Sequence, residues 1–346
     1  MSRGLVDVYK RQRRGDVWIS SLSGHWGTET RITTEPLTSG MKVIKNMDGV
    51  RNGLGEHSEV MFSLDGKPQE NSGRVIGAVL CWGGRTKIRI DSDDTYGSHV
   101  HHVFAGMNEE ASEYKLEPRE VFTTPKLALT YSCEGLGEAS RNLHRWARMG
   151  MVYSCDKPRD ILLNSWEGVY LNIKEQEMDQ MMKDFAAMGG ELFVMDDGWF
   201  GNKYRRIQDN SSLGDWVVDT QKLPHGIKGL TDTAKKYGIK FGIWIEPEFT
   251  NTKSELVEKH PDWVLRSMNR ELMCGRGGTQ VVLDLCNPKV QDFVFSVVDG
   301  LLSKNPEIAY IKWDANGEIM NYGSSYLPKD KQSHIYICLL YTSDAA

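Results

Sequence analysis

The stretch Ala309–Asn316, which reads Ala-Tyr-Ile-Lys-Trp-Asp-Ala-Asn, begins as an apolar strand and ends in polar residues. Because side chains alternate between the two faces of a strand, Lys312, Asp314 and Asn316 are expected on the same face. An ammonium group two residues away favours the ionised form of Asp314, which a carboxylate nucleophile or an electrostatic stabiliser requires. The same pattern also occurs as a simple salt bridge at a strand end, so its interpretation depends on the preceding chain.

The second half of the chain repeats an apolar strand followed by a helix. Apolar residues at helical spacing, with a terminal glycine or a leading proline, predict helices over Lys174–Met188, Ile227–Tyr237 and Pro288–Lys304. Short apolar runs predict strands at Ile161–Trp166, Glu191–Asp197, Lys240–Glu246, Val281–Leu285 and Ala309–Asp314. Repeated strand–helix units predict a parallel sheet, either doubly wound or closed as a (β/α)8 TIM barrel.

Two features favour the barrel. No Gly-x-Gly-x-x-Gly sequence follows a predicted strand, so the fingerprint of dinucleotide binding is missing. The predicted strands also end in polar or aromatic residues, and in a barrel these ends converge on one mouth. The residues are Asn164, Trp166, Asp196, Asp197, Glu246, Glu248, Asp284, Lys312, Asp314 and Asn316. Five of the eight units that a barrel requires are visible, so the predicted barrel is incomplete in this chain.

The first part of the chain has the pattern of an antiparallel β-domain. Short β-branched or alternating segments are separated by turn dipeptides such as Asp48-Gly49 and Asp65-Gly66. The clearest strands are expected at His57–Leu64, Arg74–Trp82, Thr86–Ile90 and Val121–Tyr131.

These patterns together predict a multidomain protein. We expect an N-terminal antiparallel β-sandwich over residues 13–135, a helical linker over 136–158 and the first five units of a (β/α)8 barrel over 159–337. Residues 1–12 and 338–346 resemble translated adapter sequence and are expected to be non-native ends.

Composition and charge argue against several classes of protein. The net charge of -5 over 346 residues is not concentrated in blocks, which predicts no binding to nucleic acid or to an anionic membrane. No apolar run is long enough to span a bilayer, and no secretory signal is expected. The six cysteines lie far apart without a Cys-x-x-Cys pair, which predicts reduced thiols, no zinc site and a cytoplasmic location.

Acidic side chains that converge with tryptophans suggest a carbohydrate ligand. Carboxylates accept hydrogen bonds from sugar hydroxyls, and indole faces cover the apolar face of a pyranose ring. Asp196 and Asp197 precede a Gly-Trp turn that can direct both carboxylates into the mouth, although such pairs also serve as helix caps or ion-pair partners. A second interpretation is Mg2+-dependent enolisation with Lys312 as the base. The dense tryptophans weigh against a metal site, which gains nothing from them.

Six segments of the chain occur in the order and approximate spacing seen in one known family. They are Asn164-Ser-Trp-Glu167, Phe193-Val-Met-Asp-Asp-Gly-Trp-Phe-Gly201, Leu213-Gly-Asp-Trp-Val-Val-Asp219, Gly242-Ile-Trp-Ile-Glu-Pro-Glu248, Val282-Leu-Asp-Leu285 and Ile311-Lys-Trp-Asp-Ala-Asn316. With these segments the chain resembles glycoside hydrolase family 36, in particular its bacterial α-galactosidases. The resemblance extends from about Asp16 to Met320 and includes Ser23-Gly-His-Trp26.

The resemblance implies a retaining α-galactosidase that hydrolyses terminal α-linked galactose from melibiose- or raffinose-like oligosaccharides, with no cofactor and no metal. Asp314 corresponds to the catalytic nucleophile, which attacks the anomeric carbon. The implied substrate contacts are Lys312 and Asn316 at galactose hydroxyls, Asp196 and Asp197 at O4 and O6, Trp166 and Trp244 as walls of the galactose subsite, and Arg276 as a sugar-binding arginine.

The resemblance further implies a general acid/base on a later barrel strand, and this chain ends before a matching segment. The 346-residue chain is therefore expected to be inactive alone, while the full-length protein is expected to form a homotetramer. Two alternatives stay open: a transglycosidase similar to raffinose synthase, and a fragment that only binds galactose.

Overall fold

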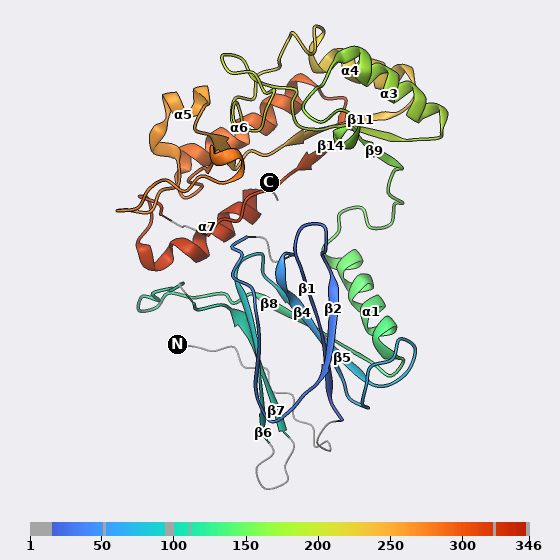
Figure 1. Cartoon of the computed structure of the whole chain (residues 1–346), viewed down its shortest axis with the longest axis vertical. Helices are drawn as coiled ribbons and strands as arrows, with labels where there is room; N and C mark the ends of the chain where they lie inside the picture. Colours follow the sequence, from blue (N-terminus) through green and yellow to red (C-terminus); the bar gives the residue numbers. More distant parts are fainter. Residues whose placement is uncertain (1–15, 51–52, 94–99, 111, 321–322, 344–346) are drawn as a thin grey trace. The chain divides into compact units, whose positions relative to one another are not determined.

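The computed structural model describes residues 16–50, 53–93, 100–110, 112–320 and 323–343 (Figure 1). The expected non-native end at residues 1–12 lies outside these residues, as does the last part of the expected end at 338–346. The chain divides into two compact units, Met1–Lys157 with Glu318–Met320 and Pro158–Gly317 with Asn321–Ala346. Each unit is described separately below.

The first unit contains two antiparallel sheets. The larger sheet has the order β2 (Arg31–Pro36), β1 (Trp18–Gly24), β4 (Gly55–Ser63), β5 (Val75–Cys81) and β8 (Lys126–Ser132). The smaller sheet has the order β3 (Gly40–Lys45), β6 (Thr86–Asp93) and β7 (Val100–Met107).

One apolar core joins the two sheets. Ile19, Val60 and Phe62 of the larger sheet belong to the same buried cluster as Ile88 and Ile90 of the smaller sheet. In β6 every second residue is buried, because side chains alternate across a strand and only one face meets the opposite sheet. The predicted β-sandwich is therefore confirmed.

The strand predicted at Val121–Tyr131 begins later than expected, at Lys126. Pro125 precedes the first ladder pair, Lys126 with Cys81. Proline has no backbone N–H to contribute to a ladder, so it confines the strand to the residues that follow. Helix α1 (Gly135–Gly150) comes directly after β8 and packs against β8 and β5 of the larger sheet.

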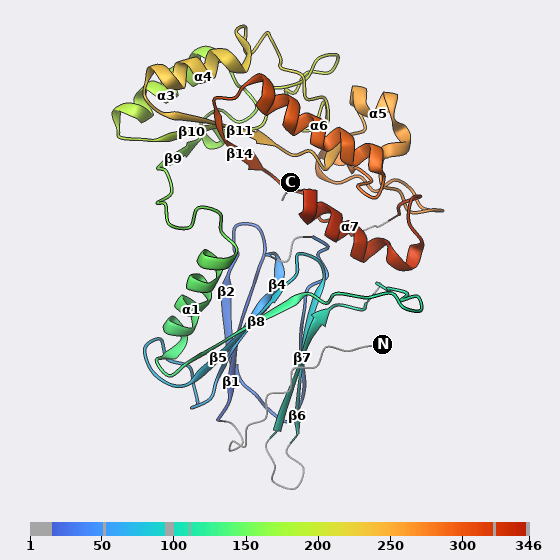
Figure 2. The ribbon, with the colours of Figure 1, turned by 180° about the vertical axis from the view of Figure 1, so that it is seen from behind.

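The second unit is built on a parallel sheet of four strands, ordered β14 (Ile308–Trp313), β11 (Lys240–Ile245), β10 (Leu192–Met195) and β9 (Leu162–Asn164) (Figure 2). All of β10 and nearly all of β11 are buried, as expected for parallel strands covered on both faces. The sheet is not closed, which agrees with the prediction of an incomplete barrel.

Helices alternate with these strands in the predicted order. They are α3 (Glu175–Ala187), α4 (Gly226–Lys236) and α6 (Pro288–Lys304), with α3 packed on β10 and α4 packed on β11. Gly189 and Gly238 follow the first two helices with φ angles of 87° and 72°. Glycine is favoured in this left-handed conformation, which ends a helix and returns the chain to the next strand. Short helices α2 (Trp166–Val169) and α5 (Glu255–Lys259) and the terminal helix α7 (Lys329–Ser343) complete the unit.

The prediction that Val281–Leu285 belongs to the parallel sheet is wrong. The observed strand β13 (Gln280–Val282) pairs antiparallel with β12 (Phe249–Asn251), and β11 pairs directly with β14. Asp284, expected among the converging strand ends, instead accepts hydrogen bonds from Ser324 Oγ and Cys286 N. A short apolar run indicates a buried strand, but it does not specify the partner or the direction of pairing.

A buried lysine holds the long connection between β10 and α4, which we call the β10–α4 loop (residues 196–225). Lys222 Nζ donates to the carbonyl oxygens of Leu171, Gly198 and Arg206 at 2.8, 2.6 and 2.7 Å. Burial lowers the pKa of Lys222 to about 8, because desolvation disfavours the ammonium form. Three separate stretches of backbone are thereby tied to one side chain.

Replacing Lys222 with methionine is expected to lower the free energy of unfolding by about 2 to 4 kcal/mol, because buried carbonyl groups lose their donor. Urea unfolding followed by tryptophan fluorescence measures the loss. Lys235→Met on the exposed side of α4 is the matched control. Equal stability of the two variants would contradict this role of Lys222.

Candidate active site

The polar residues at the ends of three strands meet on one carboxylate. Asp196, which follows β10, accepts hydrogen bonds at Oδ2 from Lys312 Nζ and from Asn164 Nδ2, both at 2.6 Å. Asn164 ends β9 and Lys312 lies in β14, two strands that are not neighbours in the sheet. Asp196 therefore links them by accepting a hydrogen bond from each. The predicted convergence of these strand ends is present in the structure. Asp196 is buried, and the ammonium group of Lys312 compensates its charge.

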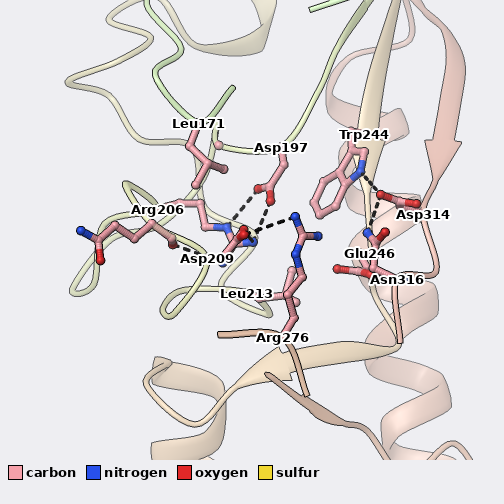
Figure 3. A network of polar contacts seen from close by, with 12 residues as sticks. Leu171, Asp197, Arg206, Asp209, Leu213, Trp244, Glu246, Arg276, Asp314 and Asn316 are labelled. Atoms are coloured by element: carbon pink, nitrogen blue, oxygen red, sulfur yellow. Dashed lines mark hydrogen bonds and ion pairs between the residues drawn. The ribbon is translucent and has the colours of Figure 1, made fainter. Parts of the chain in front are cut away.

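Asp314 directly follows β14 and accepts three hydrogen bonds. Figure 3 shows Asp314 beside Trp244 and Asn316. Trp244 Nε1 and Asn316 Nδ2 donate to Oδ2 at 3.0 and 2.6 Å, and the backbone N–H of Ala315 donates to Oδ1 at 3.1 Å. Asp314 itself is partly exposed. The carboxylate is therefore held in one orientation while remaining open on one side, as attack on a bound substrate requires.

Lys312 and Asp314 project to the face predicted for them. Trp313, between them, projects the other way and donates from Nε1 to Glu248 Oε2 at 2.8 Å. This alternation is the direct result of strand geometry, because successive side chains leave opposite faces.

Asp197 forms a buried ion pair with Arg206 from the β10–α4 loop. Arg206 Nε donates to Oδ1 at 3.0 Å and Nη2 donates to Oδ2 at 2.7 Å, so both carboxylate oxygens are bound. Desolvation raises the pKa of Asp197, and the guanidinium group of Arg206 opposes that rise. Figure 3 shows the two groups facing each other. Arg206 was not predicted, because the loop has no periodic sequence pattern that would place it at the site.

Arg276 reaches the same cluster through a second aspartate. Asp209 lies 3.3 Å from Arg206 Nη2 and 3.2 Å from Arg276 Nη2, and it therefore bridges the two arginines. Arg276 is exposed and occupies a short turn, Arg276–Gly278. The structure thus connects Arg276 to Asp197 indirectly, through Asp209 and Arg206.

The two tryptophans expected as walls of a sugar subsite differ in exposure. Trp166 is partly exposed, follows Asn164 closely and packs edge-on against Tyr170, with 5.3 Å between the ring centres. Trp244 is only 1% exposed, its ring packs against Phe200 and Trp216, and its backbone carbonyl accepts a hydrogen bond from Trp199 Nε1. Trp244 reaches the site through its N–H group at Asp314.

Glu246 is a buried carboxyl group to which the sequence assigned no role beyond its place at a strand end. Oε1 accepts from the backbone N–H of Asn316 at 2.7 Å, and Oε2 accepts from Gln280 Nε2 at 3.1 Å. Burial, reinforced by the nearby charges of Asp314 and Asp197, raises the pKa of Glu246 to about 8. Glu246 is therefore mainly protonated at neutral pH.

The described residues contain no group of three or more His, Cys, Asp or Glu side chains that could hold a metal ion. None of the helices in the described part of the chain has the length and apolar character needed to cross a membrane.

A parallel sheet with carboxylates and tryptophans at its strand ends is typical of a barrel-type glycoside hydrolase. The melibiase family model matches residues 121–343, and the model of the glycosyl hydrolase family 36 N-terminal domain matches residues 9–117. Because the first match covers more than half of the chain, this chain belongs to glycoside hydrolase family 36.

Curated relatives with similar sequences are bacterial and fungal α-galactosidases. Alpha-galactosidase AgaA of Geobacillus stearothermophilus is 36% identical over 331 residues, which are 94% of this chain and 44% of that protein. Alpha-galactosidase Mel36A of Lactobacillus acidophilus is 32% identical, over 93% of this chain and 43% of that protein. The chain therefore spans less than half the length of these relatives.

The crystal structure of AgaA superimposes with a TM-score of 0.88 and 32% identity, covering 97% of this chain and 46% of AgaA. Variants of AgaA have been solved in complex with 1-deoxygalactonojirimycin, stachyose and raffinose. The family resemblance and the fold class inferred from the sequence are thus confirmed.

The raised pKa of Glu246 predicts a specific dependence of stability on pH. Between pH 4.5, its ordinary pKa, and about pH 8, the folded state binds more protons at this site than the unfolded state. The contribution of Glu246 to the free energy of unfolding is therefore present below pH 4.5 and is lost as the pH rises to about 8. In Glu246→Gln this loss is expected to be absent, which urea unfolding at several pH values would measure.

Glutamine can still accept the hydrogen bond from Asn316 N, so the variant preserves the local geometry. Glu307→Gln, at an exposed position, is the matched control and is expected to keep the pH dependence of the parent. An unchanged pH dependence in Glu246→Gln would show that Glu246 is ionised in the folded protein at neutral pH.

Proposed function

We propose that the protein from which this chain derives is a retaining α-galactosidase acting on α-galactosyl oligosaccharides. The observation that carries the proposal is the oriented, partly exposed carboxylate of Asp314, placed beside Asn316 and on the same face as the Lys312–Asp196 pair. Support from outside the chain comes from relatives named α-galactosidase and from the stachyose and raffinose complexes of AgaA variants. The proposal assigns these substrates to this protein by similarity.

In this proposal Asp314 is the nucleophile. One oxygen attacks the anomeric carbon of galactose, the bond to the leaving oxygen breaks, and a covalent galactosyl-enzyme forms. The hydrogen bonds from Trp244 and Asn316 to Oδ2 fix the orientation of the carboxylate. Oδ1 accepts only the backbone N–H of Ala315 among these donors and is therefore the oxygen expected to attack. Water then hydrolyses the intermediate with net retention of configuration.

Asp196 and Asp197 would accept hydrogen bonds from galactose hydroxyls, including the axial O4. Lys312 and Asn316 would contact further hydroxyls, Trp166 would flank the ring, and Arg276 would bind the sugar at the exposed side. Trp244, expected from the resemblance as a second wall, has its ring buried and would act through its N–H group at Asp314. A carboxylate left without its hydroxyl partner by the equatorial epimer, glucose, costs about 1 to 3 kcal/mol. Galactose would be selected over glucose on this basis.

The nucleophile assignment is tested on the complete protein, produced from the full gene, with p-nitrophenyl α-galactoside as substrate. Asp314→Ala is expected to lower kcat by roughly 1,000-fold or more, because no covalent intermediate can form. External azide is expected to restore part of the rate by attacking the anomeric carbon in place of the carboxylate.

Asp232→Ala on helix α4 is the matched control, since Asp232 is exposed and forms a salt bridge with Lys228 of the same helix. It is expected to keep the parent activity. A folded, complete protein without activity on α-galactosides would refute the proposed function, and an active Asp314→Ala variant would refute the role of Asp314.

Substrate selection by the two aspartates gives a separate prediction. Asp196→Asn and Asp197→Asn are each expected to reduce the preference for α-galactoside over α-glucoside by about 5- to 150-fold, the equivalent of 1 to 3 kcal/mol. The ratio of kcat/KM for the two p-nitrophenyl glycosides measures this preference. A preserved ratio in both variants would place the recognition of O4 elsewhere.

Retention also requires a second carboxyl group about 5 to 5.5 Å from the nucleophile, to act as acid and then as base. The resemblance to family 36 assigns it to a later barrel strand, beyond residue 346. We therefore expect the 346-residue chain to show no efficient hydrolysis of melibiose. Turnover of melibiose by this chain that disappears in Asp314→Asn would overturn that expectation.

A further inference from the structure

Arg206 lies at the centre of the polar network in Figure 3, although it carries none of the roles assigned above. Its side chain is almost completely buried, with a relative exposure of 2%. Besides Asp197, it donates to the carbonyl oxygen of Ser211 at 2.9 Å and to Asn251 Oδ1 at 3.1 Å. It also lies 3.3 Å from Asp209. These contacts occupy every nitrogen of the guanidinium group, so Arg206 has one fixed position and is not itself a ligand for substrate.

The pairing with Arg206 determines what Asp197 can do. A carboxylate has about four acceptor positions, and the two parallel hydrogen bonds from Arg206 use one on each oxygen. The remaining positions point in directions set by the plane of the guanidinium group. An acceptor held in this way can distinguish an axial from an equatorial hydroxyl, because its orientation does not adjust to either.

The charge of Asp197 also depends on Arg206. The carboxylates of Asp209 and Asp196 face this cluster and disfavour further negative charge, and burial acts in the same direction. Glu246, the other carboxyl group beside the cluster, is mainly protonated at neutral pH. The compensating cations are Arg206, in direct contact, and Lys222, which donates only to backbone carbonyls. Burial raises the pKa of Asp197, and loss of Arg206 would raise that pKa further.

We propose that Arg206 is a positioning residue of the sugar site, which keeps Asp197 in the carboxylate form and orients it to accept a hydrogen bond from a galactose hydroxyl. This inference rests on the proposed function, and it adds a residue that the family resemblance did not assign. Arg206 acts through Asp197 and does not touch the substrate.

The test measures binding of D-galactose to the complete protein by isothermal titration calorimetry between pH 5.5 and 8.5. Galactose is uncharged over this range, so any pH dependence arises from the protein. In Arg206→Gln the affinity is expected to fall about tenfold or more at pH 6, because Asp197 becomes protonated, and to recover in part toward pH 8.5. Arg206→Lys, which keeps the charge but not the two parallel hydrogen bonds, is expected to follow the pH profile of the parent at a lower affinity.

Arg205→Gln is the matched control, because Arg205 is the neighbouring arginine of the same loop and pairs with Asp219 instead. It is expected to bind galactose as the parent does at every pH. The proposal would be overturned if Arg206→Gln lost the same amount of affinity at every pH, with no larger loss at acidic pH. Unchanged affinity for galactose would also overturn it.

A double-mutant cycle covers the case in which Arg206→Gln leaves a buried, uncompensated carboxylate and does not fold. Asp197→Asn removes that charge, and adding Arg206→Gln to it is expected to cause little further loss of affinity and no pH dependence. An additional large loss in the double variant would mean that Arg206 acts independently of Asp197 and would overturn the inference. Failure of the parent protein to bind galactose at all would instead refute the proposed function.

Discussion

The constraint on which the second unit depends is the crowding of four carboxyl groups at the carboxyl edge of one parallel sheet. Asp196, Asp197 and Glu246 are buried, and Asp314 is partly exposed beside them. Buried carboxylates are costly unless each is paired or loses its charge. Each group meets this requirement in a different way: an ammonium group for Asp196, a guanidinium group for Asp197, a proton for Glu246 and three N–H donors for Asp314.

These different solutions give neighbouring carboxyl groups different chemical properties. The proton of Glu246 reduces the total negative charge around Asp314, the proposed nucleophile. The ion pairs of Asp196 and Asp197 keep those groups as hydrogen-bond acceptors. One set of acidic residues thereby supplies both sugar recognition and covalent chemistry in the proposed mechanism.

The backbone that supports this arrangement contains buried polar groups, and each of them needs a hydrogen-bond partner. Parallel pairing brings the ends of β9, β10, β11 and β14 to the same edge, and the β10–α4 loop returns Arg206 to that edge. Lys222 binds the carbonyl groups of Gly198 and Arg206 within this loop and that of Leu171 in the segment before α3. Small displacements of the loop would therefore leave a charge or a carbonyl group unpaired.

The local features of the protein could be predicted from the amino-acid sequence alone. Alternation predicted the shared face of Lys312 and Asp314, and periodicity predicted the β-sandwich and the strand–helix units. Polar residues at the strand ends located the candidate site. These features are encoded locally, because the repeat of a strand or helix is set by a few neighbouring residues.

Contacts between groups that are distant in the sequence depend on the folded chain. Asp196 and Lys312 are 116 residues apart in the chain, and no local pattern pairs them. Long-range packing also explains why Val281–Leu285 lies outside the parallel sheet and why Trp244 is buried. It also brings Arg206 into contact with Asp197. The protonation of Glu246 depends on burial and on the surrounding charges, which exist only once the chain has folded.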